Sequence, residues 1–300
     1  MTDTVSAVIP TVGRPSLRRA VQSALSQSTP VYEVIVVLDA DRPIDLPEDD
    51  RITLLRTTFD RGPAVARQAG IDAARGSIVA MLDDDDEWLP TKTERQLEAV
   101  RTESGGNWIA SSRLSARGPG ARRRIWPRRL IKPEESIAEY LFLFTGLRAG
   151  GSELQSSTLM FPTHLARRVR WDSHDGAPHD EPSWLIRAQR SIPDLRVIQL
   201  PEVLSIYNVA GASVSRQRSD CTARYIDWGL QHLSSESPRV LGDYLCTYPV
   251  SAAVSAKSLP GAARAVQAAA RYGRPGGYAL GYAALNAIRI VLNTISAVRR

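Results

Sequence analysis

Several features that would place a chain of 300 residues in a common class are missing here. There are only two cysteines, Cys221 and Cys246, so there is no disulfide framework, and this fits a reducing cytoplasm. No GxGxxG follows the first predicted strand and no GxxxxGK[ST] occurs, which argues against a Rossmann dinucleotide site and a P-loop. The four histidines lack metal-site spacing, and no secretory signal is expected. A cytoplasmic globular protein is the expected class.

Acidic residues are missing after Asp243, where seven Lys and Arg remain. Without those seven, the 38 basic residues become 31 against 32 acidic ones, so residues 1–243 carry a formal net charge of −1. The formal charge of +6 therefore comes from the tail. We expect one large α/β domain over residues 1–218 and a basic helical region over residues 219–300.

The tail has the pattern of an amphipathic helix. Arg289 and two asparagines on its polar side argue against a membrane span. The apolar stripe consists of Leu280, Ala284, Ile288, Val291, Leu292, Ile295 and Val298. Two interpretations stay open. In the first, residues 277–300 lie on an anionic membrane surface, and the protein is peripheral on the inner face of the membrane. In the second, the apolar stripe docks on the catalytic domain or on a partner subunit of a homo-oligomer.

A second basic run, residues 113–132, contains eight Arg and Lys among Gly and Pro. It predicts a mobile loop. Nucleic-acid binding calls for interleaved aromatic residues or a known reading motif, and only Trp126 is present. We therefore expect no nucleic-acid partner.

Hydrophobic periodicity predicts an alternation of strands and helices over the first 82 residues. The expected strands are residues 5–9, 34–38, 52–55 and 78–82, and the expected helices are residues 16–27 and 63–75. Pro63 suits the first turn of the second helix and Gly76 its C-terminal cap. Short connections between such elements predict a mostly parallel sheet flanked by helices.

The residues after the fourth predicted strand are the most informative. Asp83, Asp84, Asp85 and Asp86 directly follow five apolar residues. Adjacent carboxylates repel one another, and Mg²⁺ or Mn²⁺ prefers oxygen ligands and often bridges to a phosphate. In α/β proteins, ligands bind at the carboxyl ends of strands. The run predicts a metal–phosphate site, and the alternative is an acidic turn that caps a helix near Lys92.

Motifs in this region resemble family 2 glycosyltransferases of the GT-A fold. The matching stretches are residues 8–15, 33–39, 61–70, 74–76 and 82–90, in the family's order and spacing, and the last is similar to its metal-binding DxD motif. Weaker similarity continues to residues 213–216 and fades after about residue 220. The resemblance implies a GT-A sheet flanked by helices, a C-terminal helical appendage, and inverting transfer from a nucleotide sugar.

The resemblance also implies residue roles. Asp39 is similar to the carboxylate that accepts a hydrogen bond from the pyrimidine base, and an acceptor suits the N–H edge of uracil. Arg67 resembles the arginine near the nucleotide, where a guanidinium matches phosphate geometry. Asp85 is the expected metal ligand, with Asp83 nearer the ribose or a metal-bound water. Asp83 also counts among the expected nucleotide-binding residues, and the others are Pro10, Thr11, Arg14 and Asp84.

The catalytic base is expected just before a helix. Inverting members are similar in using an Asp within a Glu-Asp pair to deprotonate the acceptor. Counting back from Arg187 places Glu181 in that slot and Asp180 before it, so the order is reversed. Glu181 is the preferred base because it reaches one methylene further, and Asp180 is the alternative. Both acids also suit the start of a helix near Pro182. Contacts to the diphosphate or the acceptor are expected from His179, Trp184 and Arg216.

The sequence thus predicts an inverting glycosyltransferase that uses Mg²⁺ or Mn²⁺ and a nucleotide sugar, expected to be uridine-linked. The acceptor would be a hydroxyl of a glycan, a lipid-linked molecule or a small molecule. Two alternatives remain. A nucleotidyltransferase also binds nucleotide and metal, and a non-catalytic membrane-docked module would keep only the nucleotide-sugar pocket.

Overall fold

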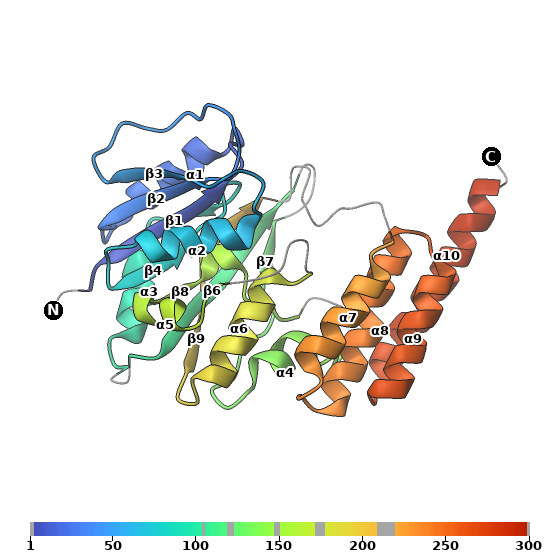
Figure 1. Cartoon of the computed structure of the whole chain (residues 1–300). Coiled ribbons are helices and arrows are strands. Elements are labelled where there is room, and N and C mark those ends of the chain that lie inside the picture. The colour runs from blue at the N-terminus through green and yellow to red at the C-terminus, as the bar shows by residue number, and fades with distance from the viewer. Residues whose placement is uncertain are drawn as a thin grey trace. The chain divides into compact units, whose positions relative to one another are not determined.

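The computed structural model describes residues 3–103, 106–118, 123–146, 151–171, 178–208 and 220–298, with side chains of the last helix up to residue 292. The chain forms two compact units (Figure 1). The sheet unit comprises Met1–Glu135, Gly151–Gly176 and Asp180–Gly211, and the helical unit comprises Ser136–Gly150, Ala177–His179 and Ala212–Arg300. The predicted boundary after residue 218 falls outside the described residues.

The sheet unit is built on one nine-stranded sheet in the order β3-β2-β1-β4-β8-β6-β9-β5, with β7 paired to β6. The strands are β1 (Val5–Thr11), β2 (Glu33–Leu38), β3 (Ile52–Arg56), β4 (Ile78–Met81), β5 (Glu87–Trp88), β6 (Trp108–Arg117), β7 (Arg124–Trp126), β8 (Met160–Pro162) and β9 (Arg196–Asn208). The first four strands along the chain, β1 to β4, pair in parallel, as the sequence predicts. Strand β8 runs antiparallel to β4 and β6, so the complete sheet is mixed. The predicted α/β fold with a central sheet flanked by helices is confirmed.

Helices cover both faces of the parallel part of the sheet. Alternate strand residues point to opposite faces. Helix α1 (Leu17–Leu25) packs on the face that carries Ile9 and Val36, and α2 (Pro63–Ala73) packs on the face that carries Val8. A Cβ on Gly70 would lie 2.4 Å from Cγ1 of Val8, so a glycine is needed where α2 meets the sheet. The other helical segments of this unit are α3 (Lys92–Val100), η1 (Ser156–Thr158), α5 (Thr163–Arg168) and α6 (Asp180–Ser191).

Two local predictions for this unit are wrong. Gly76 is not the C-cap of α2, because the helix ends at Ala73 and Ala74 is extended. Gly76 instead allows close chain approach, since a Cβ there would lie 2.6 Å from the carbonyl oxygen of Thr4. The basic run is not a loop in its described part, because β6 and β7 pair antiparallel and contain several of its arginines.

The helical unit consists of α4 (Ile137–Phe142), α7 (Thr222–Leu233), α8 (Pro238–Ser255), α9 (Leu259–Tyr272) and α10 (Gly277–Val298). Helix α8 packs against the other four. The side chains of Ser237 and Ser258 cap the starts of α8 and α9 by accepting backbone N–H groups. No helix in the described ranges is both long enough and apolar enough to cross a membrane.

Helix α10 packs through a different face from the predicted stripe. Its buried residues are Ala279, Ala283 and Ile290. Small side chains let the helices approach closely. The face with the alanines therefore packs against the neighbouring helices, although it is less apolar than the predicted stripe. Within the predicted stripe, Leu280, Ile288, Val291 and Leu292 are exposed.

Candidate active site

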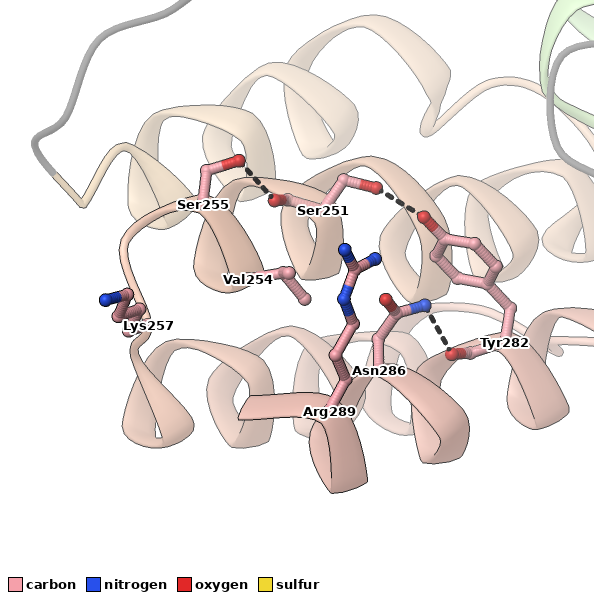
Figure 2. A pocket seen from close by; sticks show the side chains of 7 residues that line it. All are labelled: Ser251, Val254, Ser255, Lys257, Tyr282, Asn286 and Arg289. Carbon is pink, nitrogen blue, oxygen red and sulfur yellow. Dashed lines mark hydrogen bonds between the residues drawn. The ribbon is translucent and has the colours of Figure 1, made fainter. Parts of the chain in front are cut away.

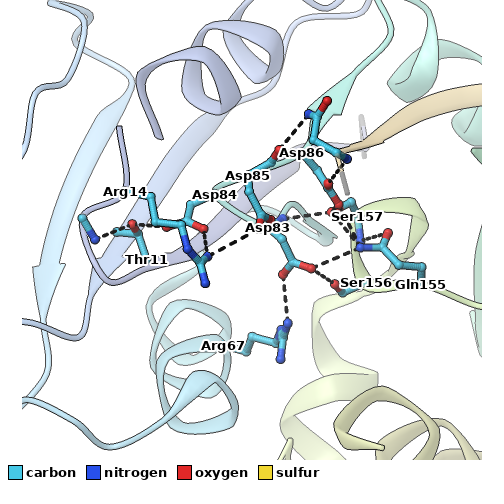
Figure 3. Close-up of polar contacts among 12 residues, drawn as sticks. Thr11, Arg14, Arg67, Asp83, Asp84, Asp85, Asp86, Gln155, Ser156 and Ser157 are labelled. Carbon is cyan, nitrogen blue, oxygen red and sulfur yellow. Dashed lines mark hydrogen bonds and ion pairs between the residues drawn. The ribbon is translucent and has the colours of Figure 1, made fainter. Parts of the chain in front are cut away.

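The four aspartates follow β4, which lies between β1 and β8 in the sheet. The backbone N–H of Asp86 donates to the carbonyl oxygen of Asp83 at 3.1 Å, which closes a tight turn. The turn sends the carboxylates toward different partners (Figure 3). We call residues 83–86 the aspartate turn.

Asp84 joins the aspartate turn to the end of β1. Its carboxylate is 1% exposed and accepts hydrogen bonds from Oγ1 of Thr11 at 2.5 Å and from Arg14. Burial lowers the pKa of the Arg14 guanidinium, but Asp84 and the neighbouring aspartates outweigh this and raise it. The Thr11 oxygen also accepts from the backbone N–H of Gly13 at 2.8 Å. Thr11, Arg14 and Asp84 therefore hold the first loop in place.

Asp83 and Asp86 are held by the segment before β8. Gln155 Nε2 donates to Oδ2 of Asp83 at 3.1 Å and to Oδ2 of Asp86 at 2.9 Å. Ser156 donates to Asp83 at 2.5 Å, and Ser157 donates to Asp86 at 2.7 Å. Burial and the charge of Asp83 raise the pKa of Asp86 well above its usual value. These hydroxyl and amide donors offset part of the repulsion between the two carboxylates.

Asp85 has the most accessible carboxylate described in the turn. Its side chain is 36% exposed, and its Oδ2 lies 3.7 Å from a guanidinium nitrogen of Arg14. Burial raises the pKa of Asp85, and Asp83 and Asp84 raise it further against the opposing effect of Arg14. An added cation would relieve this repulsion.

A divalent cation at this turn would take some of its ligands from the protein and the others from a bound substrate and water. In the described part of the chain, no group of three or more His, Cys, Asp or Glu side chains is arranged to hold a metal ion. Mg²⁺ is commonly bound through one or two carboxylates together with substrate phosphates and water. Asp85 fits that ligand set, whereas both oxygens of Asp83 already accept protein donors.

Arg67 connects the aspartate turn to the start of α6. It is 6% exposed, donates to Oδ1 of Asp83 at 2.8 Å and also donates to Asp180. Oε1 of Glu181 lies 3.8 Å from the same guanidinium, which stacks 5.3 Å from the ring centre of Trp171. Burial alone would lower the pKa of Arg67, but the three carboxylates raise it, so the side chain stays charged. Three acids from two distant segments converge on one cation.

The two acids at the start of α6 differ in what they touch. Asp180 accepts from Arg67 with one oxygen and from Nε1 of Trp171 at 2.9 Å with the other. Among the described residues, the ion-pair contact of Glu181 is the longer one to Arg67. Burial raises the pKa of Glu181, Arg67 opposes the shift, and Asp180 and Asp83 add to it. Glu181 is thus the carboxylate better suited to accept a proton.

Asp39 lies at the end of β2 and is 7% exposed. It accepts from the hydroxyl of Thr57 and from the backbone N–H groups of Arg61 at 3.1 Å and Gly62 at 2.8 Å. These bonds fix the loop that precedes α2. A carboxylate offers about four lone-pair positions, so Asp39 retains capacity for one further donor.

The remaining predicted residues have surroundings different from those of the aspartate turn. Pro10 is buried within β1, opposite Val37. Trp184 is fully buried and stacks on Trp171 with ring centres 4.6 Å apart, so it is a core residue. His179 belongs to the helical unit, where burial lowers its pKa to about 3. Arg216 lies outside the described residues.

The residues that support the aspartate turn were not predicted from the sequence. Gln155, Ser156 and Ser157 had only the weak similarity around residues 156–161 as a signal. Asn208, which donates to the carbonyl oxygen of Asp85 at 2.8 Å, had none. Glu153 was missed as well. Burial and the nearby Glu181 raise its pKa to about 7.

The chain is similar to known glycosyltransferases. Residues 6–152 match the model of Glycosyl transferase family 2. The amylovoran biosynthesis glycosyltransferase AmsB of Erwinia amylovora is 27% identical over 214 residues, which cover 67% of this chain and 68% of AmsB. The Escherichia coli enzyme WfaP, named UDP-Glc:alpha-D-GlcNAc-diphosphoundecaprenol beta-1,3-glucosyltransferase, is 32% identical over 95 residues, 30% of this chain and 38% of WfaP.

A solved structure shares the fold. TarS residues 1–349 of S. aureus, crystallised with UDP-GlcNAc, superpose with a TM-score of 0.56 over 89% of this chain and 81% of that chain, at 13% identity. The matched family model spans both β1 and the aspartate turn. Residues 6–152, just under half of the chain, therefore carry the similarity to glycosyl transferase family 2.

Proposed function

We propose that the chain transfers a sugar, with inversion, from a uridine-linked nucleotide sugar to a hydroxyl group of a glycan, lipid-linked or small-molecule acceptor. The observation that carries the proposal is the convergence of Asp83, Asp180 and Glu181 on the buried Arg67. It joins the predicted donor-binding turn to the predicted base. The names of AmsB and WfaP, which refer to amylovoran biosynthesis and to UDP-Glc, support this substrate class.

The donor side uses residues at the carboxyl ends of β1, β2 and β4. Asp39 would accept the N–H of the uracil ring with its remaining capacity. A Mg²⁺ or Mn²⁺ ion on Asp85 would supply positive charge against the charge that develops on the leaving diphosphate. Thr11, Arg14 and Asp84 hold the neighbouring loop, so the site is organised before the donor arrives.

Glu181 is the proposed base. Its raised pKa makes it a better proton acceptor than an ordinary glutamate, and its carboxylate is less engaged than that of Asp180. Asp180 instead orients Arg67. The acceptor O–H proton moves to Glu181 while the acceptor oxygen bonds to the anomeric carbon. The bond from that carbon to the diphosphate breaks on the opposite face, and the nucleoside diphosphate leaves.

The metal assignment is tested with Asp85→Ala. We measure binding of UDP and of a panel of UDP-sugars by calorimetry with MnCl₂ and with EDTA, together with UDP release. The wild-type chain is expected to bind more tightly with Mn²⁺, and the variant is expected to lose this difference, a loss of at least ~10-fold. Asp194→Ala, which removes an exposed carboxylate bonded to Asn107, is the matched control and is expected to bind as wild type.

Three results would contradict the proposal. An unchanged Mn²⁺ dependence in Asp85→Ala would remove Asp85 from the metal site. Donor binding without UDP release to any acceptor or to water would indicate a binding module. Release of pyrophosphate from a nucleoside triphosphate would indicate a nucleotidyltransferase.

A further inference from the structure

The helical unit contains a pocket of about 400 Å³ between α8 and α10 (Figure 2). The side chains that line it are Ser251, Val254, Ser255, Lys257, Tyr282, Asn286 and Arg289. Five of the seven are uncharged and two are cationic. No carboxylate lines the pocket, which agrees with the absence of acidic residues after Asp243.

Most hydroxyl donors in the pocket are already used within it. Ser251 donates to the carbonyl oxygen of Thr247 at 2.8 Å and shares a 2.8 Å hydrogen bond with the hydroxyl of Tyr282. Ser255 donates to the carbonyl oxygen of Ser251 at 3.1 Å. Asn286 uses one amide hydrogen on the carbonyl oxygen of Tyr282 at 2.9 Å. The donors left for a ligand are the second amide hydrogen of Asn286 and the two cationic groups.

Those cationic groups have no counter-charge in the described part of the chain. Neither Lys257 nor Arg289 forms an ion pair there, whereas Arg239 and Arg264 of the same unit pair with aspartates. Lys257 lies at a positive φ of 53° directly after α8, where backbone N–H groups already satisfy the last carbonyls of the helix. Figure 2 shows Arg289 pointing from α10 toward α8. A guanidinium and an ammonium without partners are suited to an anion such as phosphate.

Exposed apolar side chains lie beside the pocket on α10. Leu285 and Leu292 stand four residues before and three residues after Arg289, so they share its side of the helix. They are 65% and 58% exposed, and Ile288 next to them is 56% exposed. Leucines this exposed next to a cationic pocket are the pattern of a surface that meets both headgroups and acyl chains.

We propose that this pocket binds the phosphate of an anionic membrane lipid, while Leu285, Ile288 and Leu292 enter the acyl layer. The combination of an uncompensated cationic pair with adjoining apolar side chains selects a lipid over a soluble anion, because a soluble phosphate would not use the apolar residues. The inference is independent of the proposed glycosyl transfer, since its test measures lipid binding alone.

The test uses the full chain and co-sedimentation with vesicles of phosphatidylcholine, with or without phosphatidylglycerol. The pocket variant carries Lys257→Gln and Arg289→Gln. The matched control carries Arg271→Gln and Arg274→Gln, which removes two exposed positive charges from the same unit outside the pocket. We expect wild type to bind the phosphatidylglycerol vesicles only. The pocket variant is expected to lose at least ~10-fold more affinity than the control, beyond the general attraction of roughly fivefold per basic residue. Leu285→Ser with Leu292→Ser is expected to lose binding as well.

Other outcomes overturn the proposal. Equal losses in the pocket and control variants would mean diffuse electrostatic attraction. Binding of inorganic phosphate in calorimetry without vesicle binding would mean a soluble anion. A dimer in sedimentation velocity that the leucine variants dissociate, again without vesicle binding, would mean that a second copy covers the leucines. Melting curves of all variants establish that each is folded.

Discussion

In the sheet unit, Arg67 is almost fully buried and each of its neighbours in the aspartate turn or α6 is an acid. In the helical unit, Lys257 and Arg289 are exposed and have no acid beside them in the described residues. Arg67 is thus paired inside the sheet unit, whereas Lys257 and Arg289 are exposed to solvent.

The difference between Arg67 and the pair of Lys257 and Arg289 follows from burial. A buried charge is stable only with a partner, so the ion pairs of the sheet unit fix the relative positions of segments over a hundred residues apart. An exposed cation needs no partner, and its long-range field stays available for an anionic surface. Arg67 therefore contributes to the geometry of the sheet unit, whereas Lys257 and Arg289 remain available to an anion.

The largest expected effect is that of Glu181→Gln in the sheet unit. Donor affinity is expected to stay within a few-fold, while transfer falls by at least ~10², because the amide cannot accept the proton. Glu98→Gln, on the exposed face of α3, is the matched control. The measurement is UDP release under saturating donor. A larger loss in Asp180→Asn than in Glu181→Gln would place the base one residue earlier.

The proposed base also predicts a pH dependence of the transfer rate. The base must be deprotonated, and its pKa is raised by burial. As pH decreases, the transfer rate of wild type is therefore expected to fall at a pH above the titration range of an ordinary glutamate. The residual activity of Glu181→Gln is expected not to show this fall.

The next effect is expected from Asp243→Ala, which removes a buried acid that joins several described segments of the helical unit. Asp243 is 0% exposed and accepts from the backbone N–H of Phe144 at 2.9 Å, from Gly276 at 2.7 Å and from Nε of Arg239 at 2.9 Å. Two partly buried N–H groups would lose their acceptor, at a cost of about 2–4 kcal/mol. Hydrogen exchange is expected to show lost protection in α8 and α10. Asp227→Ala, at an exposed position of α7, is expected to change little, and equal effects would refute the role of Asp243.

The smallest effect concerns Lys92, a buried cation of the sheet unit that forms no ion pair with the described residues. It is fully buried, donates to Gln96 at 2.7 Å and lies 4.3 Å from the ring centre of Trp88, and burial lowers its pKa to about 7. Between pH 7 and the normal lysine range, the unfolded chain binds the extra proton, so stability rises with pH there. Relative to Lys92→Met, wild type is expected to gain roughly 1 kcal/mol per pH unit from pH 7 to 9. A difference between the melting temperatures that does not change with pH would contradict this.

The parallel half of the fold was predictable because it depends on local patterns. Strands β1, β2 and β4 are buried on both faces, and their sequences are mostly apolar. The rest depends on contacts between distant segments. The antiparallel pairing of β8 with β4 leaves no periodic signal in a strand of three residues. The packing face of α10 was missed because close approach of alanines outweighed hydrophobicity.

The same distinction between local patterns and distant contacts applies to the candidate site. Asp85, Asp39 and the acids of α6 follow motifs with fixed spacing, so they could be named in advance. The convergence on Arg67 could not, because nothing local in the sequence shows that residues 67 and 180 meet. Gln155 and Asn208 support the aspartate turn through hydrogen bonds from segments that are distant in the sequence, and such contacts have no pattern along the chain.

The bridge made by Arg67 has a thermodynamic consequence. A diphosphate that arrives near this guanidinium competes with Asp83 and Asp180 for it, and adds negative charge beside Glu181. Negative charge stabilises the protonated carboxyl, so donor binding favours proton uptake by the base. By reciprocity, protonation of the base must favour the donor by the same factor. In the proposed mechanism, donor affinity and the pKa of Glu181 are therefore linked through one coupling free energy, to which Arg67 contributes.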